Sequence, residues 1–345
     1  MVVGGVALLT ETFSPGERGQ VLGWCAASVY LGISLGPTLG GLLVGLGGWR
    51  VLFWSPLVPG GLSLVLLASL RSGERSGGLG GLDGISCALF GLGLGGLLWG
   101  LPRFGEPEGW AALGAGVLLW GGFGRRQLRL PDPVLDLRLF LSRRVYAFSN
   151  LAALLHYGAT YGVSFLLSLY LQELRGLSPR DTGLLLAVQP ILQMLFSPLA
   201  GRLSDRFDPG RLASLGMGVT GLGLGALLLQ GPGTPLSLLG AALAVQGLGF
   251  AFFSSPNTNA ILGSVQRRDL GQASAALALM RVLGQAGSMV LVTAVLNAHG
   301  LGGAPLGADP AGALAVLKGC FALFSGLCVL GIFLSLARGS REETA

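Results

Sequence analysis

Ten long apolar runs, joined by short polar connections, constrain this chain more than any other feature of its sequence. A helix needs about 20 apolar residues to cross the hydrocarbon core of a bilayer. Only 11% of the 345 residues are charged and 51% are hydrophobic, whereas a soluble domain carries about 25% charged residues. This balance excludes a soluble enzyme, a disordered protein and a nucleic-acid binder, and it predicts an all-α polytopic protein in a lipid bilayer. The predicted spans are residues 20–47, 51–70, 82–101, 110–124, 146–171, 183–200, 211–230, 235–262, 271–297 and 312–337.

The segment before the first run is apolar but short. Residues 1–10 read MVVGGVALLT and would rise about 15 Å as a helix, half of a bilayer core of about 30 Å. The segment lacks the charged start and the small-residue cleavage site of a signal peptide. We therefore predict the second half of a membrane helix at this position.

Arginine placement predicts the orientation of the chain. If residues 11–19 face the cytoplasm and the following loops alternate, 16 basic residues lie on the cytoplasmic side and four on the outside. This bias follows the positive-inside rule and predicts a multi-pass protein of the inner or plasma membrane. The two remaining basic residues lie within spans, and we expect Arg281 to snorkel to the cytoplasmic side and Lys318 to the outside.

The first long run carries a distinctive glycine pattern. Gly32, Gly36 and Gly40 recur every four residues, and Pro37 and Gly41 lie among them. Glycines at this spacing give a helix face without side chains, on which another helix can pack closely. Proline removes one backbone hydrogen bond and bends the helix. We expect this face to be a seal and a hinge, and generic glycine packing is the alternative.

That glycine pattern resembles the antiporter motif of drug exporters in the major facilitator superfamily. Further stretches resemble motifs of the same exporters in the same order: GWRVLFW at 48–54, PDPVLDLRLF within 131–144, GRLSDRFDPGR at 201–211, and the GQASA and RVLGQAG segments within 271–287. The resemblance covers nearly the whole chain and points to the fourteen-helix drug:proton antiporter branch. It implies a major facilitator-type helical bundle of about ten full helices and one partial helix.

The resemblance also implies a domain organisation. Residue 1 aligns with the middle of the fourth helix of the family, so three and a half helices would be missing and the chain would be inactive alone. Residues 1–70 would be the remainder of an N-terminal bundle. Residues 71–144 would be a linker region with two extra helices and a basic cytoplasmic loop. The C-terminal six-helix bundle would occupy 145–338, and 339–345 would be a cytoplasmic tail.

The segment 201–211 also has a direct physical interpretation. Asp205 can accept hydrogen bonds from the N-terminal amides of a helix or from an arginine, which would form a cytoplasmic latch between helices. The alternative is simple positive-inside charge. Asp208 stands where the resembled loop has glycine. The predicted latch residues are Gly201, Arg202, Asp205, Arg206 and Arg211.

Polar and aromatic residues within the later spans are candidates for a substrate cavity. Aromatic faces suit a lipophilic cation, and His156 could carry a proton. Hydrogen bonding between helices is the alternative role. All 16 acidic residues lie in loops, span ends or the tail, so the resemblance implies that the coupling carboxylate lies in the missing helices. The cavity candidates are Asn150, His156, Tyr157, Tyr161, Gln189, Gln193 and Asn257.

Together these features predict a secondary active transporter and not an enzyme. We expect proton-coupled efflux of amphiphilic or cationic small molecules by alternating access, with the proton gradient as the energy source and no cofactor or metal. A membrane enzyme would need clustered His, Asp or Glu within the spans, and the sequence has no such cluster. The alternatives are an uptake permease for sugars or organic ions, and a remnant that does not transport.

Overall fold

The computed structural model describes residues 2–14, 16–48, 50–69, 83–131, 133–301 and 309–339. Within these ranges the regular elements are all helices, and each of the ten predicted spans coincides with helical segments. The all-α polytopic fold class is therefore confirmed. The predicted linker at 71–82 and most of the predicted tail lie outside the described residues.

The helices follow one another in three groups along the chain. The N-terminal group consists of α1 (Val2–Thr12), α2 (Arg18–Gly47), α3 (Val51–Trp54) and α4 (Leu57–Ser69). The second group is a hairpin of α5 (Gly84–Gly100), the 3-10 turn η1 (Leu101–Arg103) and α6 (Pro107–Gln127), followed by α7 (Leu137–Ser142). The last group contains α8 (Arg144–Leu169) with its π-helical extension η2 (Tyr170–Leu174), α9 (Pro179–Leu186), α10 (Val188–Arg206), α11 (Pro209–Leu227), α12 (Leu236–Gly263), η3 (Arg267–Asp269), α13 (Leu270–Ala298) and α14 (Pro310–Ala337).

Among the described residues, six helical segments are long and apolar enough to cross a membrane. Three further helices, α2, α6 and α11, have 30, 21 and 19 residues, so each extends about 28 Å or more at about 1.5 Å per residue. The full count of ten spans stays a prediction. The six qualifying segments are Gly84–Arg103, Arg144–Leu174, Pro179–Arg206, Leu236–Gly263, Arg267–Ala298 and Pro310–Ala337.

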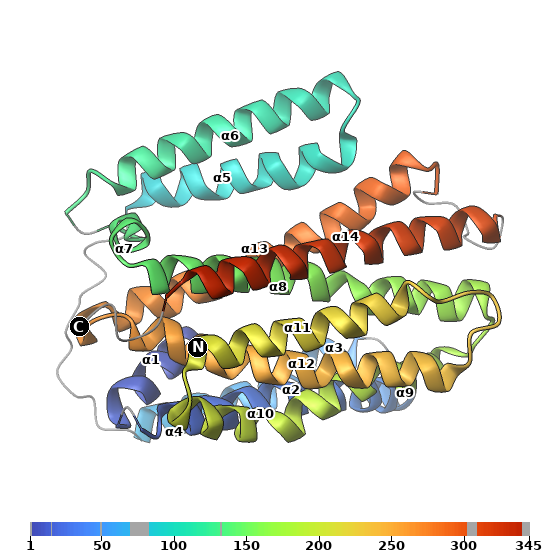
Figure 1. The fold of residues 1–345 in the computed structure, drawn as a ribbon, viewed down its shortest axis with the longest axis horizontal. Helices are drawn as coiled ribbons and strands as arrows, with labels where there is room; N and C mark the ends of the chain where they lie inside the picture. The colour runs from blue at the N-terminus through green and yellow to red at the C-terminus, as the bar shows by residue number, and fades with distance from the viewer. Residues whose placement is uncertain are drawn as a thin grey trace.

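The helices run roughly side by side, so the bundle has two ends (Figure 1). At one end, Arg143 donates a hydrogen bond to the Ser264 carbonyl at 2.8 Å. At the other, Arg175 donates to the Thr234 carbonyl at 2.7 Å. The arginine pattern predicts that each pair shares a side of the membrane. We term the first end, predicted to be cytoplasmic, the inner end, and the second the outer end.

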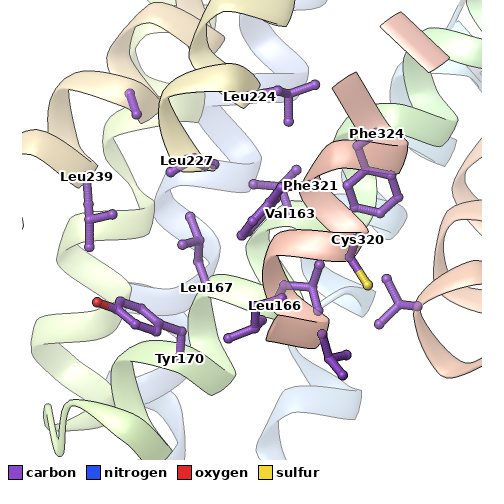
Figure 2. Close-up of a cluster of buried hydrophobic side chains, with 14 of the residues drawn as sticks. Val163, Leu166, Leu167, Tyr170, Leu224, Leu227, Leu239, Cys320, Phe321 and Phe324 are labelled. Carbon is purple, nitrogen blue, oxygen red and sulfur yellow. The ribbon is translucent and has the colours of Figure 1, made fainter. Parts of the chain in front are cut away.

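The core of the C-terminal group is a cluster of side chains from α8, α11, α12 and α14 (Figure 2). Val163 and Leu167 of α8 lie beside Leu227 of α11 and Phe321 of α14, and all four are fully buried. Lipid tails are as apolar as these side chains, so close packing and not exclusion from water stabilises such contacts. A second buried cluster, which includes Leu22 and Tyr30 of α2, joins the N-terminal helices to the C-terminal group.

The α5–α6 hairpin lies beside α13 at the edge of the bundle (Figure 1). Its two helices approach closely, because a Cβ at Gly96 would meet the backbone of Ala112 and Gly116. The glycine-rich stretch of α5 therefore serves helix packing. At the inner end of the hairpin, the Arg126 guanidinium lies 2.7 Å from the Asp83 carboxylate and holds the pKa of that carboxyl well below its usual range.

Candidate transport cavity

A cavity of about 680 Å³ lies between α1 and α2 on one side and the C-terminal group on the other. Its volume falls within the range of about 300–1,000 Å³ that small-molecule sites occupy. Most of its walls are apolar, and hydroxyl and amide side chains supply scattered polar groups. The polar and charged lining residues are Ser34, Thr160, Ser164, Gln189, Gln193, Ser254, Ser255, Thr258, Ser274, Arg281 and Gln285, with Tyr30, Tyr157 and Tyr161 as the tyrosines.

Four of the predicted cavity residues lie in this lining. Tyr157 and Tyr161 come from α8, one helical turn apart, and Gln189 and Gln193 come from the start of α10 in the same relation. Tyr161 is 50% exposed, whereas both glutamines are buried. The spacing of four residues places each pair on one face of its helix, which is why both members reach the cavity.

Three predicted cavity residues do not line the cavity, and the prediction is wrong for them. His156 is fully buried, with its ring stacked on Phe253 at a centroid distance of 3.9 Å and no hydrogen-bond partner at either nitrogen among the described residues. Asn150 donates to the Tyr146 carbonyl, and Asn257 donates to the Ser149 carbonyl. A step of one residue turns a side chain by about 100° around a helix, so His156 points into the bundle although its neighbour faces the cavity.

Arg281 was expected to snorkel to the cytoplasmic side, and the structure contradicts this. The residue lies eleven positions after the start of α13, about 16 Å along the helix, beyond the reach of its side chain to the inner end. Instead Arg281 lines the cavity, and its guanidinium carbon lies 5.0 Å from the Tyr157 ring centroid. Its Nε atom is buried without a hydrogen-bond partner in the described part of the chain. It is the one charged side chain among the described lining residues.

Tyr30 of α2 extends the aromatic wall and was missed by the sequence analysis. Its hydroxyl is 3.2 Å from the Ser254 hydroxyl of α12, and its ring meets Phe250 edge-on at 5.9 Å. Tyr157 meets the same Phe250 ring at 5.4 Å. Edge-to-face pairs at such distances are favourable aromatic contacts. Phe250 thus joins tyrosines from α2 and α8 on one wall.

At the inner end of the bundle, α2 and α10 are in direct contact. Asp205, at the end of α10, accepts hydrogen bonds from the Gly19 amide at 2.7 Å and the Gln20 amide at 2.9 Å. A carboxylate at a helix N-terminus satisfies amides that have no partner within the helix and interacts favourably with the helix dipole. Asn259 of α12 donates to Ser204 at 3.0 Å and lies 3.5 Å from the Asp205 carboxylate. Of the two partners predicted for Asp205, the structure shows the helix amides.

Glycines allow this close approach. A Cβ at Gly201 would collide with the Gly19 carbonyl, and a Cβ at Gly23 would collide with the Ser197 carbonyl. In contrast, Gly32 and Gly36 have no neighbouring atom within 4 Å of the position a Cβ would take, so these two glycines form no close helix contact in this conformation.

The rest of the predicted hinge belongs to α2, which continues without a break past Pro37. Pro37, Gly40 and Gly41 lie within this helix, but the surroundings of their side chains lie outside the described part. The predicted bend therefore does not interrupt the helix.

The arginines of the predicted latch do not pair with Asp205. Arg202, Arg206 and Arg211 are exposed, and the two ion pairs of the described ranges involve other residues. Asp208 accepts a hydrogen bond from the Arg211 amide at 2.7 Å and caps the N-terminus of α11. An aspartate at this position thus has a structural reason, since N-caps favour Asp.

Arg338 follows α14 at the inner end and is a buried structural arginine that the sequence analysis missed. It is buried and donates hydrogen bonds to the Ser149 hydroxyl at 2.9 Å, the Asn257 side chain at 3.3 Å and the Ser335 carbonyl at 2.7 Å. Burial lowers the pKa of its guanidinium to about 10. In the sequence nothing separates it from the other arginines of the inner loops, so only its surroundings reveal its role.

The described ranges contain no cluster of side chains that could hold a metal ion. No group of three or more His, Cys, Asp or Glu side chains is close enough to hold a metal ion there. The four cysteines are free.

Comparisons with known proteins agree with this architecture. Residues 1–125 and 150–345 match the Major Facilitator Superfamily. The chain is 31% identical over 322 residues to the uncharacterized transporter YebQ of Escherichia coli, covering 91% of this chain and 70% of the relative. It is 28% identical to the riboflavin transporter RibZ of Clostridioides difficile, covering 81% of this chain and 61% of that protein. It is 29% identical to the tetracenomycin C resistance and export protein of Streptomyces glaucescens, covering 83% and 54%.

A solved structure has a similar fold. The human organic anion transporter MFSD10 aligns with 97% of this chain and 67% of its own, at a TM-score of 0.58 and 22% identity, which shows the fold alone. The chain spans a little over half to 70% of the length of the three curated relatives above. The match to the superfamily covers most of the chain, and the chain therefore belongs to the Major Facilitator Superfamily, a family of membrane transporters and not of enzymes.

Proposed function

We propose that this protein is a secondary active transporter of the cell membrane that exports amphiphilic small molecules by alternating access, driven by the proton gradient. The observation that carries the proposal is the cavity between α1, α2 and the C-terminal group, together with the contact at the inner end that joins α2 and α10 through Asp205 and the amides of α2. A carrier needs a central site whose two ends seal in turn. The inner seal would represent one of these two states.

The outer part of α2 supports the second state. Gly36 lies three residues after Ile33 and seven after Val29, and both of those residues line the cavity. Residues three and seven apart share a face of a helix, so Gly36 lies on the cavity face of α2 and has open space beside it. A helix that moves toward this bare face would close the outer end, which is the role proposed for the Gly32–Gly41 segment.

Export is supported by relatives, and proton coupling by the resemblance to antiporters. The tetracenomycin C protein is named for resistance and export, and a further relative, 29% identical over 306 residues, is the multidrug resistance protein Stp of Mycobacterium tuberculosis. The described cavity lining contains no carboxylate, and His156 is enclosed by Phe250 and Phe253. We propose that the coupling carboxylate lies outside the described residues.

Transport in oriented membrane vesicles tests the proposal. Everted vesicles from cells that produce the protein should take up an amphiphilic dye, either the cationic Hoechst 33342 or the anionic carboxyfluorescein, when respiration acidifies their interior, and a protonophore should abolish the uptake. Vesicles without the protein are the control. Energised uptake that resists the protonophore would contradict proton coupling. Absence of any uptake would contradict export by this chain and favour the alternative of a remnant that does not transport.

Uptake of an aromatic nutrient is the second candidate function. One relative is a riboflavin transporter, and the tyrosine and phenylalanine wall of the cavity suits a flat aromatic solute. Right-side-out vesicles that accumulate labelled riboflavin, while everted vesicles take up no dye, would favour this alternative over export.

A further inference from the structure

We propose that Arg281 and Tyr157 form a subsite that binds the negatively charged group of an aromatic solute, so that the C-terminal half of the cavity selects organic anions. This inference deepens the proposed function and rests on it. It also differs from the cationic substrate that the aromatic residues alone predicted.

The surroundings of Arg281 are the first argument. Its guanidinium carbon lies 5.0 Å from the Tyr157 ring centroid, and its Nε has no hydrogen-bond partner among the described residues. The titratable groups that interact with it are Tyr157, Tyr30 and Cys25, which are residue types that are uncharged at neutral pH. Neither of the ion pairs in the described ranges involves Arg281. The positive charge therefore has no protein counter-charge in this part of the structure.

The partial burial of Arg281, whose Nε atom is fully buried, favours an anion beside it. An unpaired charge in a low-dielectric site is costly, and a counter-ion that enters relieves the cost. The planar guanidinium offers parallel N–H donors that match a carboxylate or sulfonate. A cationic ligand at the same place would instead meet a like charge, and Coulomb repulsion is strong where water is excluded.

The aromatic wall beside Arg281 supplies the second half of the recognition. Tyr157, Phe250 and Tyr30 form a continuous series of edge-on ring contacts at 5.4 and 5.9 Å. A flat ring can lie on this wall while its acidic substituent reaches Arg281. The solute class that fits both features is an aromatic carboxylate or sulfonate, and the cavity of about 680 Å³ has room for it.

Equilibrium dialysis of the purified protein in lipid nanodiscs tests the subsite without requiring transport. The probe is radiolabelled 1-naphthoate, and the competitors are neutral 1-naphthamide and cationic 1-naphthylmethylammonium. The wild-type protein should bind naphthoate at least tenfold more tightly than naphthamide, and the ammonium compound most weakly. Equal affinity for the three compounds would overturn the proposal, including the case in which a carboxylate outside the described residues already pairs with Arg281.

Variants distinguish a binding role from a structural one. Arg281→Gln should weaken naphthoate binding at least tenfold and leave naphthamide binding within twofold, and Arg281→Lys should recover part of the preference. The matched control is Arg180→Gln, an exposed arginine of α9, which should change neither. An equal loss of both ligands in Arg281→Gln, with Arg281→Lys unable to restore the anion preference, would overturn the proposal.

These experiments distinguish failure of the anion subsite from failure of the proposed transport function. Naphthoate preference without dye transport in vesicles would support the subsite and contradict export by this chain. Dye transport without naphthoate preference would support the transporter and overturn the subsite. If Arg281→Gln does not fold, the proposal is tested by the order of the wild-type affinities for the three ligands and by whether Arg281→Lys keeps part of the preference for naphthoate.

Discussion

The contact between Asp205 and the N-terminus of α2 yields the sharpest prediction. Asp205→Asn keeps the size of the side chain and one oxygen acceptor but removes the negative charge. At present the carboxylate accepts two amide hydrogen bonds, at 2.7 and 2.9 Å. Bonds to a charged acceptor contribute about 1.5–3 kcal/mol each and a neutral bond about 0.5–1.5 kcal/mol, while a charge at a helix N-terminus adds about 0.3–1 kcal/mol.

Asp205 is partly exposed, so we take the lower values of these ranges. The substitution should then destabilise the closed inner end by about 2 kcal/mol, which corresponds to about a thirtyfold change in the ratio of closed to open molecules. Double electron–electron resonance between spin labels at Glu17 and Arg202, both exposed, measures the ratio of closed to open molecules after replacement of the four free cysteines. The population with a long distance should rise in the variant.

Asp208→Asn is the matched control, because it removes the same charge from the same loop. Asp208 caps α11 and not α2. The ratio of closed to open molecules in this variant should therefore stay within threefold of the wild-type ratio. If Asp205→Asn shifts the ratio less than threefold, or if both variants shift it equally, the carboxylate does not hold the inner end closed.

Three further predictions follow from other contacts. Gly201→Ala should open the inner end in the same spin-label assay, because its Cβ would collide with the Gly19 carbonyl and overpacking costs about 1–3 kcal/mol. The Cβ of Gly36→Ala meets open space, so this variant should leave the closed inner end unchanged. An inner end that opens in Gly36→Ala but not in Gly201→Ala would contradict the packing. Arg338→Leu should lower the melting temperature far more than Arg202→Leu, since it leaves buried oxygen atoms without donors; equal effects would contradict a structural role. Asp83→Asn should destabilise the α5–α6 hairpin at pH 7, but progressively less as pH falls below about 4. The pKa of the Asp83 carboxyl is depressed in the folded state, so its ionised form stabilises the folded protein fully above the unfolded pKa of about 3.9, and this stabilisation is lost as the carboxyl is protonated in acid. Thermal unfolding followed by tryptophan fluorescence measures the stability difference between variant and wild type, and a difference that does not depend on pH would contradict the ion pair.

The overall architecture was predictable because a bilayer leaves few choices. Backbone groups in lipid must be satisfied within a helix, so the apolar runs identified the helices. The arginine pattern then predicted which helix ends lie together. The hydrogen bonds from Arg143 to Ser264 and from Arg175 to Thr234 each join helix ends that this pattern placed on the same side. The sequence also contained the reason for the α5–α6 packing, because glycines in both helices lie where the backbones meet.

The site was only partly predictable, because a local pattern does not reveal which face of a helix meets which neighbour. Tyr157 and His156 are adjacent in sequence, yet one lines the cavity and the other stacks on Phe253. A span hydrophobic on all sides gives no periodic signal to separate them. The sequence likewise does not separate Arg281 and Arg338 from the surface arginines, because partners far away in the sequence, and not the neighbouring residues, determine where their charges lie.

The arrangement of α2 connects the two kinds of glycine in this chain. Gly19 and Gly23 pack on α10 at the inner end, and Gly36, nearer the other end of α2, has open space beside it. Gly36 follows Gly19 by seventeen positions, about 26 Å along a helix, and the cavity-lining stretch from Leu22 to Ser34 lies between them. A helix that is bare near both ends of one cavity can pack closely at either end while its middle keeps contact with the solute. Rocking of α2 against the C-terminal group would therefore exchange one seal for the other without removing Arg281 and Tyr157 from the cavity wall.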